Sequence, residues 1–147
     1  MQGRRPACRC VSWNDAQVFI MQLSAATGRK DSLPTEAQWE YAASGGNRNN
    51  GYKYSGSNRL ADVAWYKGNS EQSSHPVGAK LPSELGIHDM SGNVWEWCED
   101  YFNNKTDRVL CGGSWSVVAE GCLVTCRGVG TQAIRRSAVG FRVVLVP

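Results

Sequence analysis

The sequence predicts a single α+β domain in which two helices come first and short strands and long loops follow. The length of 147 residues is that of one domain. Two capping boxes, each followed by apolar residues at helical spacing, stand in the first third of the chain. The rest contains most of the 16 glycines and 6 tryptophans among short apolar runs, which is typical of loop-rich structure. We expect residues 1–147 to form one domain.

Each helix has its own start signal. Ser12 and Asp15 form the first capping box, and the helix that follows is expected to end at Gly28. Thr35 and Gln38 form the second box. The helix after Thr35 is expected to end at the glycine pair that follows it.

The strands are expected to be short. Val63–Tyr66 and Gly92–Cys98 are candidates, the second because apolar and polar residues alternate along it. Gly140–Val146 is apolar enough to be a central terminal strand. The polar segments Asn47–Asn58 and Asn69–Ser74 are expected to be surface loops.

Charge and hydropathy exclude several classes of function. The net charge is +3 and no basic run exceeds two residues, so we expect no nucleic-acid partner. The apolar runs are too short for direct membrane insertion. Met1–Cys10 carries basic residues without a following apolar stretch, so we expect no secretory signal in this chain. The spacing of the six cysteines does not match structural zinc.

Four segments together carry a family resemblance: Leu33–Gly46, Pro76–Cys98, Arg108–Trp115 and Gly140–Val143. They resemble the formylglycine-generating-enzyme, or sulfatase-modifying-factor, family over nearly all of residues 11–146. The resemblance implies a variant of the C-type lectin fold. It also implies that this chain lacks the strands with which the family domain usually opens.

The catalytic cysteines of the family are not reproduced. In its enzymes, two cysteines separated by four residues follow the GGS motif, bind copper and oxidise a cysteine of a client protein. The corresponding residues here are Val117 and Cys122. One thiol cannot supply the two thiolates that soft Cu(I) prefers. The resemblance therefore implies neither copper nor an enzyme, and a formylglycine-generating oxidase is the alternative.

A narrower resemblance concerns residues 108–142. They are similar to the variable proteins of diversity-generating retroelements, in which asparagine codons are rewritten at their adenines and the altered side chains bind the ligand. Scattered residues after Trp115 can each arise from the codon AAC in this way. The ligand-binding residues implied are Trp115, Ser116, Val117, Val118, Gly121, Leu123, Cys126, Gly128, Val129, Gly130, Ser137, Ala138 and Val139.

This resemblance also implies a partner and a place. The partner is a macromolecule, with a protein favoured, and the place is a cell surface or a phage particle of a bacterial system. The oligomeric state is left open. A structural domain without diversification is a third interpretation.

A calcium site is implied by four further residues. Asp89, Gly92, Val94 and Glu96 match the positions that hold calcium in formylglycine-generating enzymes. Two carboxylates and two backbone carbonyls suit a hard cation. The alternative is that Asp89 and Glu96 pair with arginines or cap backbone N–H groups.

Tryptophans and cysteines complete the expectations. Trp39, Trp95 and Trp97 are expected in the core because large aromatic side chains bury much area. The family resemblance implies a disulfide between Cys98 and Cys122, with buried free thiols as the alternative. Cys111 and Cys126 stand where the family usually has other residues.

Overall fold

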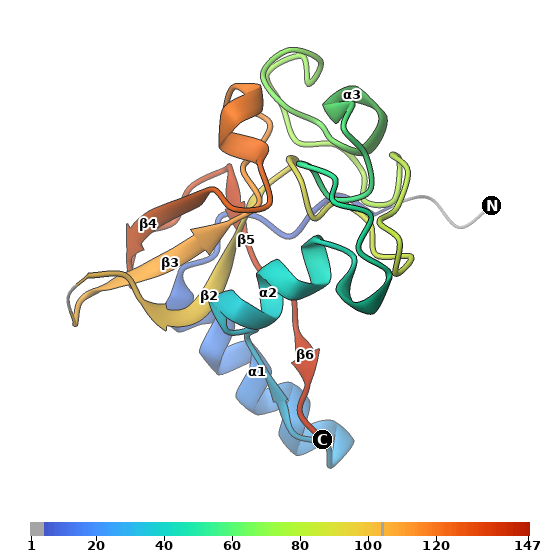
Figure 1. Ribbon diagram of the computed structural model, residues 1–147. Coiled ribbons are helices and arrows are strands. Elements are labelled where there is room, and N and C mark those ends of the chain that lie inside the picture. Colours follow the sequence, from blue (N-terminus) through green and yellow to red (C-terminus); the bar gives the residue numbers. More distant parts are fainter. Residues whose placement is uncertain (1–4, 104) are drawn as a thin grey trace.

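The computed structural model describes residues 5–103 and 105–147 (Figure 1). Two main helices precede a small sheet, and a long irregular segment lies between them. The elements are α1 (Trp13–Thr27), β1 (Asp31–Ser32), α2 (Glu36–Ala43), the 3₁₀ turn η1 (Gly46–Arg48), α3 (Leu60–Val63), β2 (Trp95–Tyr101), β3 (Asp107–Cys111), the 3₁₀ turn η2 (Ala119–Cys122), β4 (Arg127–Thr131), β5 (Val139–Gly140) and β6 (Val144–Leu145).

Both capping boxes form as expected. The Ser12 hydroxyl accepts from the Asp15 amide at 3.0 Å, and the Asp15 carboxylate accepts from the Ser12 amide at 2.9 Å. Gly28 ends α1 in the left-handed conformation. Thr35 and Gln38 make the same reciprocal pair at the start of α2. Local hydrogen bonding therefore fixes where both helices begin.

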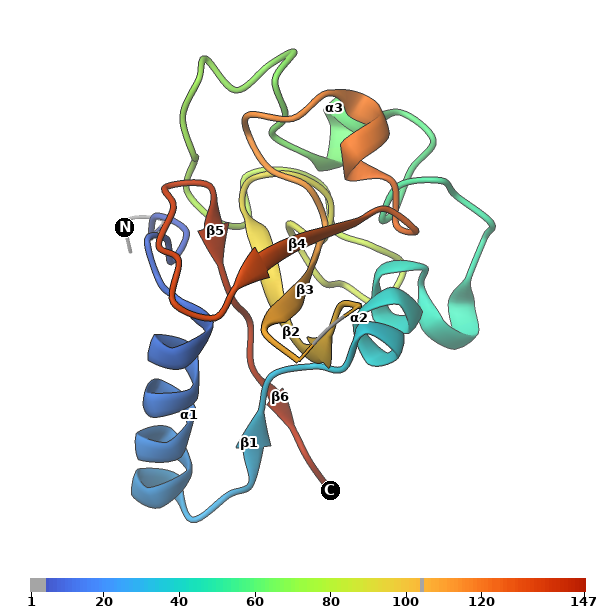
Figure 2. The same cartoon turned by 90° about the vertical axis from the view of Figure 1, so that its left-hand side faces the viewer.

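Four strands form the main sheet in the order β4-β3-β2-β5, and β1 pairs with β6. Strand β5 runs parallel to β2, whereas the other neighbours are antiparallel. The expected strand at Gly92–Cys98 forms three residues later, as β2. The helix α2 packs against β2 and β3, and α1 lies with β1 and β6 at one end of the molecule (Figures 1 and 2).

Two strand predictions are wrong. Val63–Tyr66 is not a strand, because the chain makes the helical turn α3 just before it and the Ala64 amide donates to the Leu60 carbonyl at 2.9 Å. Gly140–Val146 is not one central strand. It contributes β5 at the sheet edge and β6 in the separate pair. At Gly140 a side chain would overlap the Cys8 carbonyl, so that backbone lies close to the N-terminal segment.

The core consists of three clusters of buried side chains. Trp39 and Trp97 are fully buried, each at the centre of one cluster, as expected. Trp95 is only partly buried and packs at the edge of the Trp97 cluster. The third cluster surrounds Cys122.

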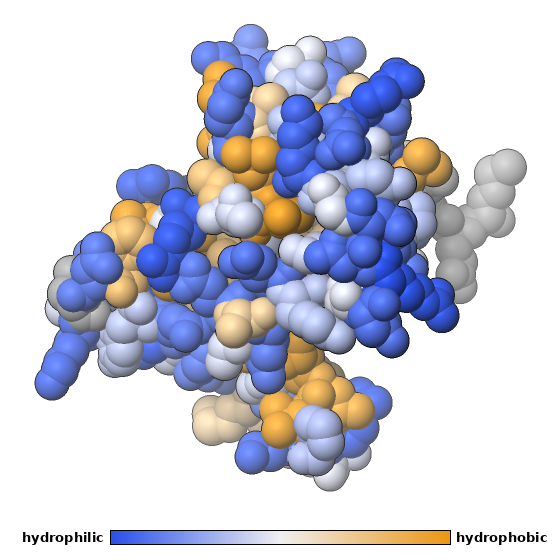
Figure 3. Space-filling view, in the orientation of Figure 1, coloured by the Kyte–Doolittle hydropathy of each residue, from blue (hydrophilic) through white to orange (hydrophobic). Residues whose placement is uncertain are grey.

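Helix α1 contributes to this core through a narrow stripe. It buries Ala16 and Ile20, whereas Val18, Phe19 and Met21 remain about half exposed or more. The apolar side chains at the lower end of Figure 3 lie in this part of the molecule. In the described part of the chain, α1 included, no helix has both the length and the apolar character needed to span a membrane.

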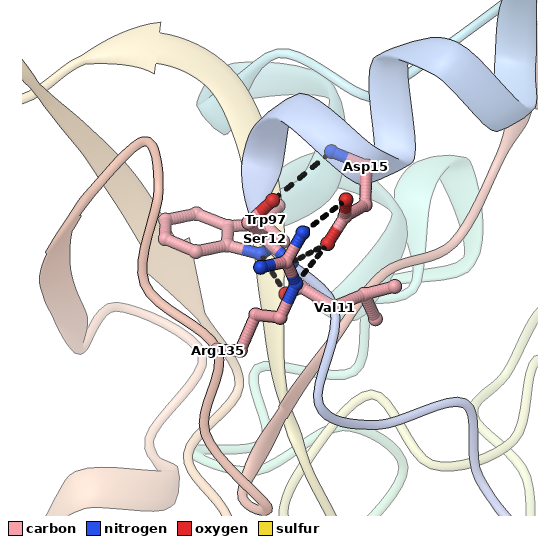
Figure 4. A network of polar contacts seen from close by, with 5 residues as sticks. All are labelled: Val11, Ser12, Asp15, Trp97 and Arg135. Carbon is pink, nitrogen blue, oxygen red and sulfur yellow. Dashed lines mark hydrogen bonds and ion pairs between the residues drawn. The ribbon is translucent and has the colours of Figure 1, made fainter.

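The N-terminus of α1 also holds the segment between β4 and β5. Both carboxylate oxygens of Asp15 accept hydrogen bonds from Arg135, each at 2.7 Å (Figure 4). The Asn14 amide donates to the Gln132 carbonyl at 3.3 Å. Beside them, the Trp97 indole donates to the Val11 carbonyl at 2.9 Å. One capping residue thus ties a helix to a segment 120 residues away.

Replacing Asp15 with asparagine should remove a pH-dependent part of the stability. The hydrogen bonds from Arg135 hold the pKa of Asp15 well below its ordinary value. Such a group stabilises the fold above the unfolded pKa of about 4, and the contribution is lost as the pH falls toward the folded pKa. Denaturant unfolding should show wild type as the more stable protein at pH 7, with a difference that shrinks below about pH 4.

The matched control is Asp62→Asn, because Asp62 faces Arg59 at 3.6 Å in a surface pair that is worth little. A stability difference between wild type and Asp15→Asn that stays constant down to pH 2 would contradict the assignment.

Candidate functional site

The residues implied in ligand binding lie in three segments on one side of the molecule. The first segment runs from Trp115 through η2 to Cys126, the second is strand β4, and the third is residues 137–139, which lead into β5. Figure 2 looks onto this side, which is the left-hand side of Figure 1. The indole of Trp115 lies 3.5 Å from the Ser137 carbonyl, and the Trp95 amide donates to the Ala138 carbonyl at 2.7 Å. The first contact joins the first and the third segment, and the second ties the third segment to β2.

The implied residues differ in exposure. Ser116, Val118, Val129 and Ser137 are exposed, with 54% of Val118 and 44% of Val129 accessible to solvent. The side chains of these four residues are accessible to a partner in the present conformation. The partly buried members are Trp115, Val117, Gly121, Leu123, Cys126, Gly128 and Ala138.

Two of the implied residues belong to the interior. Val139 is 2% exposed and packs in the Trp97 cluster. Gly130 is buried, and a Cβ placed there would lie 2.7 Å from the Ile134 side chain and 2.8 Å from the Trp97 ring. Their expected place on a binding face is therefore wrong, because β4 and β5 turn these positions toward the core.

Trp115 stands beside a recess. A cavity of about 380 Å³ is lined by Trp115, Ser116, Lys67, Ser70 and Gln72. The Ser70 hydroxyl donates to the Trp115 carbonyl at 2.7 Å, which fixes the backbone at the rim. The recess combines an indole, a cation and polar groups next to exposed residues of the first segment.

The residues implied in calcium binding lie around a second cavity. Asp89, Val94 and Glu96 line a cavity of about 390 Å³ that also contains Arg142, and Gly92 lies two residues before Val94. One oxygen of Asp89 accepts from the Gly78 amide at 2.7 Å, whereas Oδ1 is buried without a hydrogen-bond partner. Burial raises the pKa of Asp89 above its ordinary value.

Glu96 is already neutralised. Its two oxygens accept from Arg142 Nε at 2.7 Å and Nη2 at 2.8 Å, and Oε2 also accepts from the Trp39 indole at 2.7 Å. For Glu96, the structure therefore shows the alternative to calcium binding, which was an ion pair with an arginine. Calcium affinity follows the number of charged ligands, and Asp89 is then the only uncompensated carboxylate of the set. The residues present do not fit a calcium ion while Arg142 holds Glu96. Arg142, the arginine that pairs with Glu96, belongs to the Gly140–Val143 segment of the family resemblance.

The cysteine positions do not form a copper-binding pair. Val117 has no thiol, and Cys122 is fully buried in the third cluster. Burial raises the pKa of Cys122 to about 12, so it is a protonated thiol at neutral pH. The chain's own residues at this place therefore do not fit a copper ion held by two thiolates.

The disulfide implied for Cys98 and Cys122 is also wrong. Cys98 lies in the cluster around Trp39, whereas Cys122 lies in the third cluster. The Cys98 sulfur is 3.6 Å from that of Cys111, and all six cysteines are free thiols. Cys111 is buried, although nothing in its sequence surroundings indicated a partner. Its antiparallel strand neighbour β2 brings the two together.

Comparison with known proteins finds relatives among formylglycine-generating enzymes and their inactive homologues. The model of the sulfatase-modifying factor enzyme 1-like domain matches residues 2–146. The inactive C-alpha-formylglycine-generating enzyme 2 of Bos taurus is 36% identical over 149 residues, which cover 90% of this chain and 48% of that protein. The formylglycine-generating enzyme of Streptomyces coelicolor is 34% identical over 165 residues, which cover 90% and 50%.

A solved structure is similar over the whole chain. Treponema denticola variable protein 1 matches with a TM-score of 0.91 at 29% identity, covering 100% of this chain and 73% of that one. The expected α+β, C-type lectin-like fold class is thereby confirmed. The chain spans about half the length of the two curated relatives.

Calcium should not raise the melting temperature of the wild-type protein, because Arg142 already compensates Glu96. In Arg142→Gln the freed carboxylate and Asp89 become available together, and millimolar calcium should raise the melting temperature of that variant by mass action. Thermal melts with calcium or with a chelator measure both responses.

The double variant Arg142→Gln, Asp89→Asn is the control and should lose the response. A rise in the wild-type melting temperature that Asp89→Asn abolishes would show that calcium binds despite Arg142.

Proposed function

We propose a function from one premise: the chain belongs to the sulfatase-modifying factor enzyme 1-like family. The proposed function is non-catalytic ligand binding. A C-type lectin-like scaffold displays a diversified surface to a macromolecular partner, which we take to be a protein. The likeness to an inactive family member and to a variable protein supports this function, and the likeness to a formylglycine-generating enzyme makes oxidase activity the alternative.

One observation carries the proposal. At the place where an oxidase needs two reactive thiols, this chain offers a valine and one enclosed cysteine. A thiol must be ionised to act as nucleophile or metal ligand, and both require access. Cys122 is fully buried, and the burial that raises its pKa keeps it protonated. Val117 supplies no second sulfur, so the chemistry of the enzymes has no counterpart here.

The shape of the implied face supports binding. Exposed residues from three segments meet on one side, while the backbone beneath them is held by the core and by the Asp15–Arg135 pair. Side chains such as Val118 and Val129 can change without disturbing buried neighbours. We infer that the diversified side chains on this face contact the ligand.

The chemistry of the face favours a protein partner. Its exposed valines and serines form a small, weakly polar surface, and Trp115 stands beside the recess with Lys67 and Gln72. Tryptophan is among the residues that contribute most to protein interfaces. An indole next to small side chains suits a protruding side chain of another protein better than a flat, highly charged polymer.

Purified protein supplied with copper should not convert a Cys-X-Pro-X-Arg peptide to its formylglycine product, since Val117 stands where the first catalytic cysteine is expected. Mass spectrometry of the peptide measures the conversion, and the Streptomyces coelicolor enzyme under the same conditions is the positive control. Aldehyde formed above the level of a copper-only reaction would establish the oxidase alternative instead.

Replacing valine with asparagine should be nearly neutral at exposed positions of the implied face and destabilising at the buried one. Val118→Asn and Val129→Asn should each change the free energy of unfolding by less than about 0.5 kcal/mol, because their side chains are exposed. Val139→Asn should cost at least about 2 kcal/mol, because it buries an amide and removes packing in the Trp97 cluster.

Denaturant unfolding of the three variants measures these differences. If Val118→Asn and Val129→Asn were as damaging as Val139→Asn, those valines would be core residues and the variable face would be refuted.

A further inference from the structure

We propose that Cys98 and Cys111 form a covalent modification site, in which a small-molecule disulfide oxidises the two thiols to an intramolecular disulfide between β2 and β3. The observation that carries this is their contact. The sulfur atoms lie 3.6 Å apart, and both residues are buried. Within residues 5–103 and 105–147, this is the only pair of thiols in contact.

The strand register explains the contact. Glu96 pairs with Cys111, and Trp97 pairs with Leu110 in the antiparallel ladder. A side chain two residues after Glu96 points to the same face of β2, which puts Cys98 diagonally across from Cys111. The register shifts between Trp97 and Tyr101, at the point where Cys98 stands. The two side chains therefore meet over the Trp39 cluster.

The two sulfur atoms already lie in contact, at less than twice the length of a disulfide bond. A disulfide has a sulfur–sulfur distance of about 2.05 Å, so the atoms must approach by about 1.5 Å from the observed 3.6 Å. The Cys98 thiol donates to the Cys111 sulfur, and no other side chain stands between two atoms at this separation. Closing the bond requires rotation about the side-chain bonds together with a shift of the bulged strand, because Cβ atoms at diagonal positions of a ladder are ordinarily farther apart than a disulfide allows.

The small disulfide RSSR is the oxidant, and it accepts the two electrons that the cysteine thiols lose. The thiolate of one cysteine attacks the small disulfide RSSR, which forms a mixed disulfide and releases one RSH after protonation. The second cysteine loses its proton, attacks the protein sulfur of the mixed disulfide and releases the second RSH. Two S–H bonds are lost, one protein S–S bond forms, and the oxidant takes up both electrons. Because both thiols are buried, the first attack requires a brief opening of the hairpin end.

The bond would restrain the hairpin that joins β2 to β3. It closes the chain between residues 98 and 111, a loop for which the chain-entropy model predicts substantial stabilisation. The GGS turn follows Cys111 directly, and Glu96 stands two residues before Cys98. The disulfide would therefore restrain the end of β3, from which the first segment of the candidate binding face continues.

The test uses the full chain, reduced with dithiothreitol and then incubated with oxidised glutathione. We expect a species lighter by two hydrogen atoms, and peptide mapping should identify a peptide pair linked through Cys98 and Cys111. In denaturant, this species should titrate two fewer thiols than the reduced protein. Its melting midpoint should be higher by roughly 5–10 °C and should return to the reduced value with dithiothreitol.

Variants separate this pair from the other cysteines. Cys98→Ala and Cys111→Ala should each prevent the linked peptide, whereas Cys122→Ala, which removes an equally buried thiol, should leave it. Cys8→Ser, Cys10→Ser keeps the exposed thiols from competing. The thiol count of oxidised wild type in denaturant tests the bond even where a variant fails to fold. Either a Cys98–Cys122 link or an unlinked pair after the exposed thiols have reacted would overturn the proposal.

Discussion

A carboxylate enclosed in a protein interior needs partners, and the partners of Glu96 hold this domain together. Glu96 is 5% exposed and stands in β2, between Cys111 of β3 and Gly140 of β5 in the sheet. Its side chain accepts from the Trp39 indole in α2 and from Arg142 near the C-terminus. An unpaired charge at this depth is strongly unfavourable. The folded structure therefore requires Glu96, Trp39 and Arg142 to be packed against one another. Helix α2, the main sheet and the segment near the C-terminus are thus coupled through one side chain.

Features that depend on neighbours in sequence were predictable. Ser12 and Thr35 start helices because their hydroxyls and the side chains three residues later exchange hydrogen bonds locally. Features that depend on distant partners were not. The apolar run after Gly140 indicated a strand, but its pairing is divided between β2 and β1, and Arg142 in the middle is drawn to Glu96. Periodicity alone does not contain that information.

The candidate site shows the same division. Its segments were implied by the family resemblance, and Trp115 does stand at the edge of a recess. Burial could not be inferred from the resemblance, because Val129 and Val139 are identical in type and opposite in environment. The contact of Cys98 with Cys111 was likewise hidden. It arises from the register of two strands rather than from any sequence pattern.

The packing of Gly130 against Trp97, together with the enclosed Val139, limits the size of any useful repertoire. On the proposed function, a mutagenic process that rewrites the codons of this region does so without regard to burial. Chains altered at these two positions then carry a stability cost that is independent of the ligand. New side chains reach a partner mainly at outward positions such as Val118 and Val129, so fewer sequences are useful than the codons could encode.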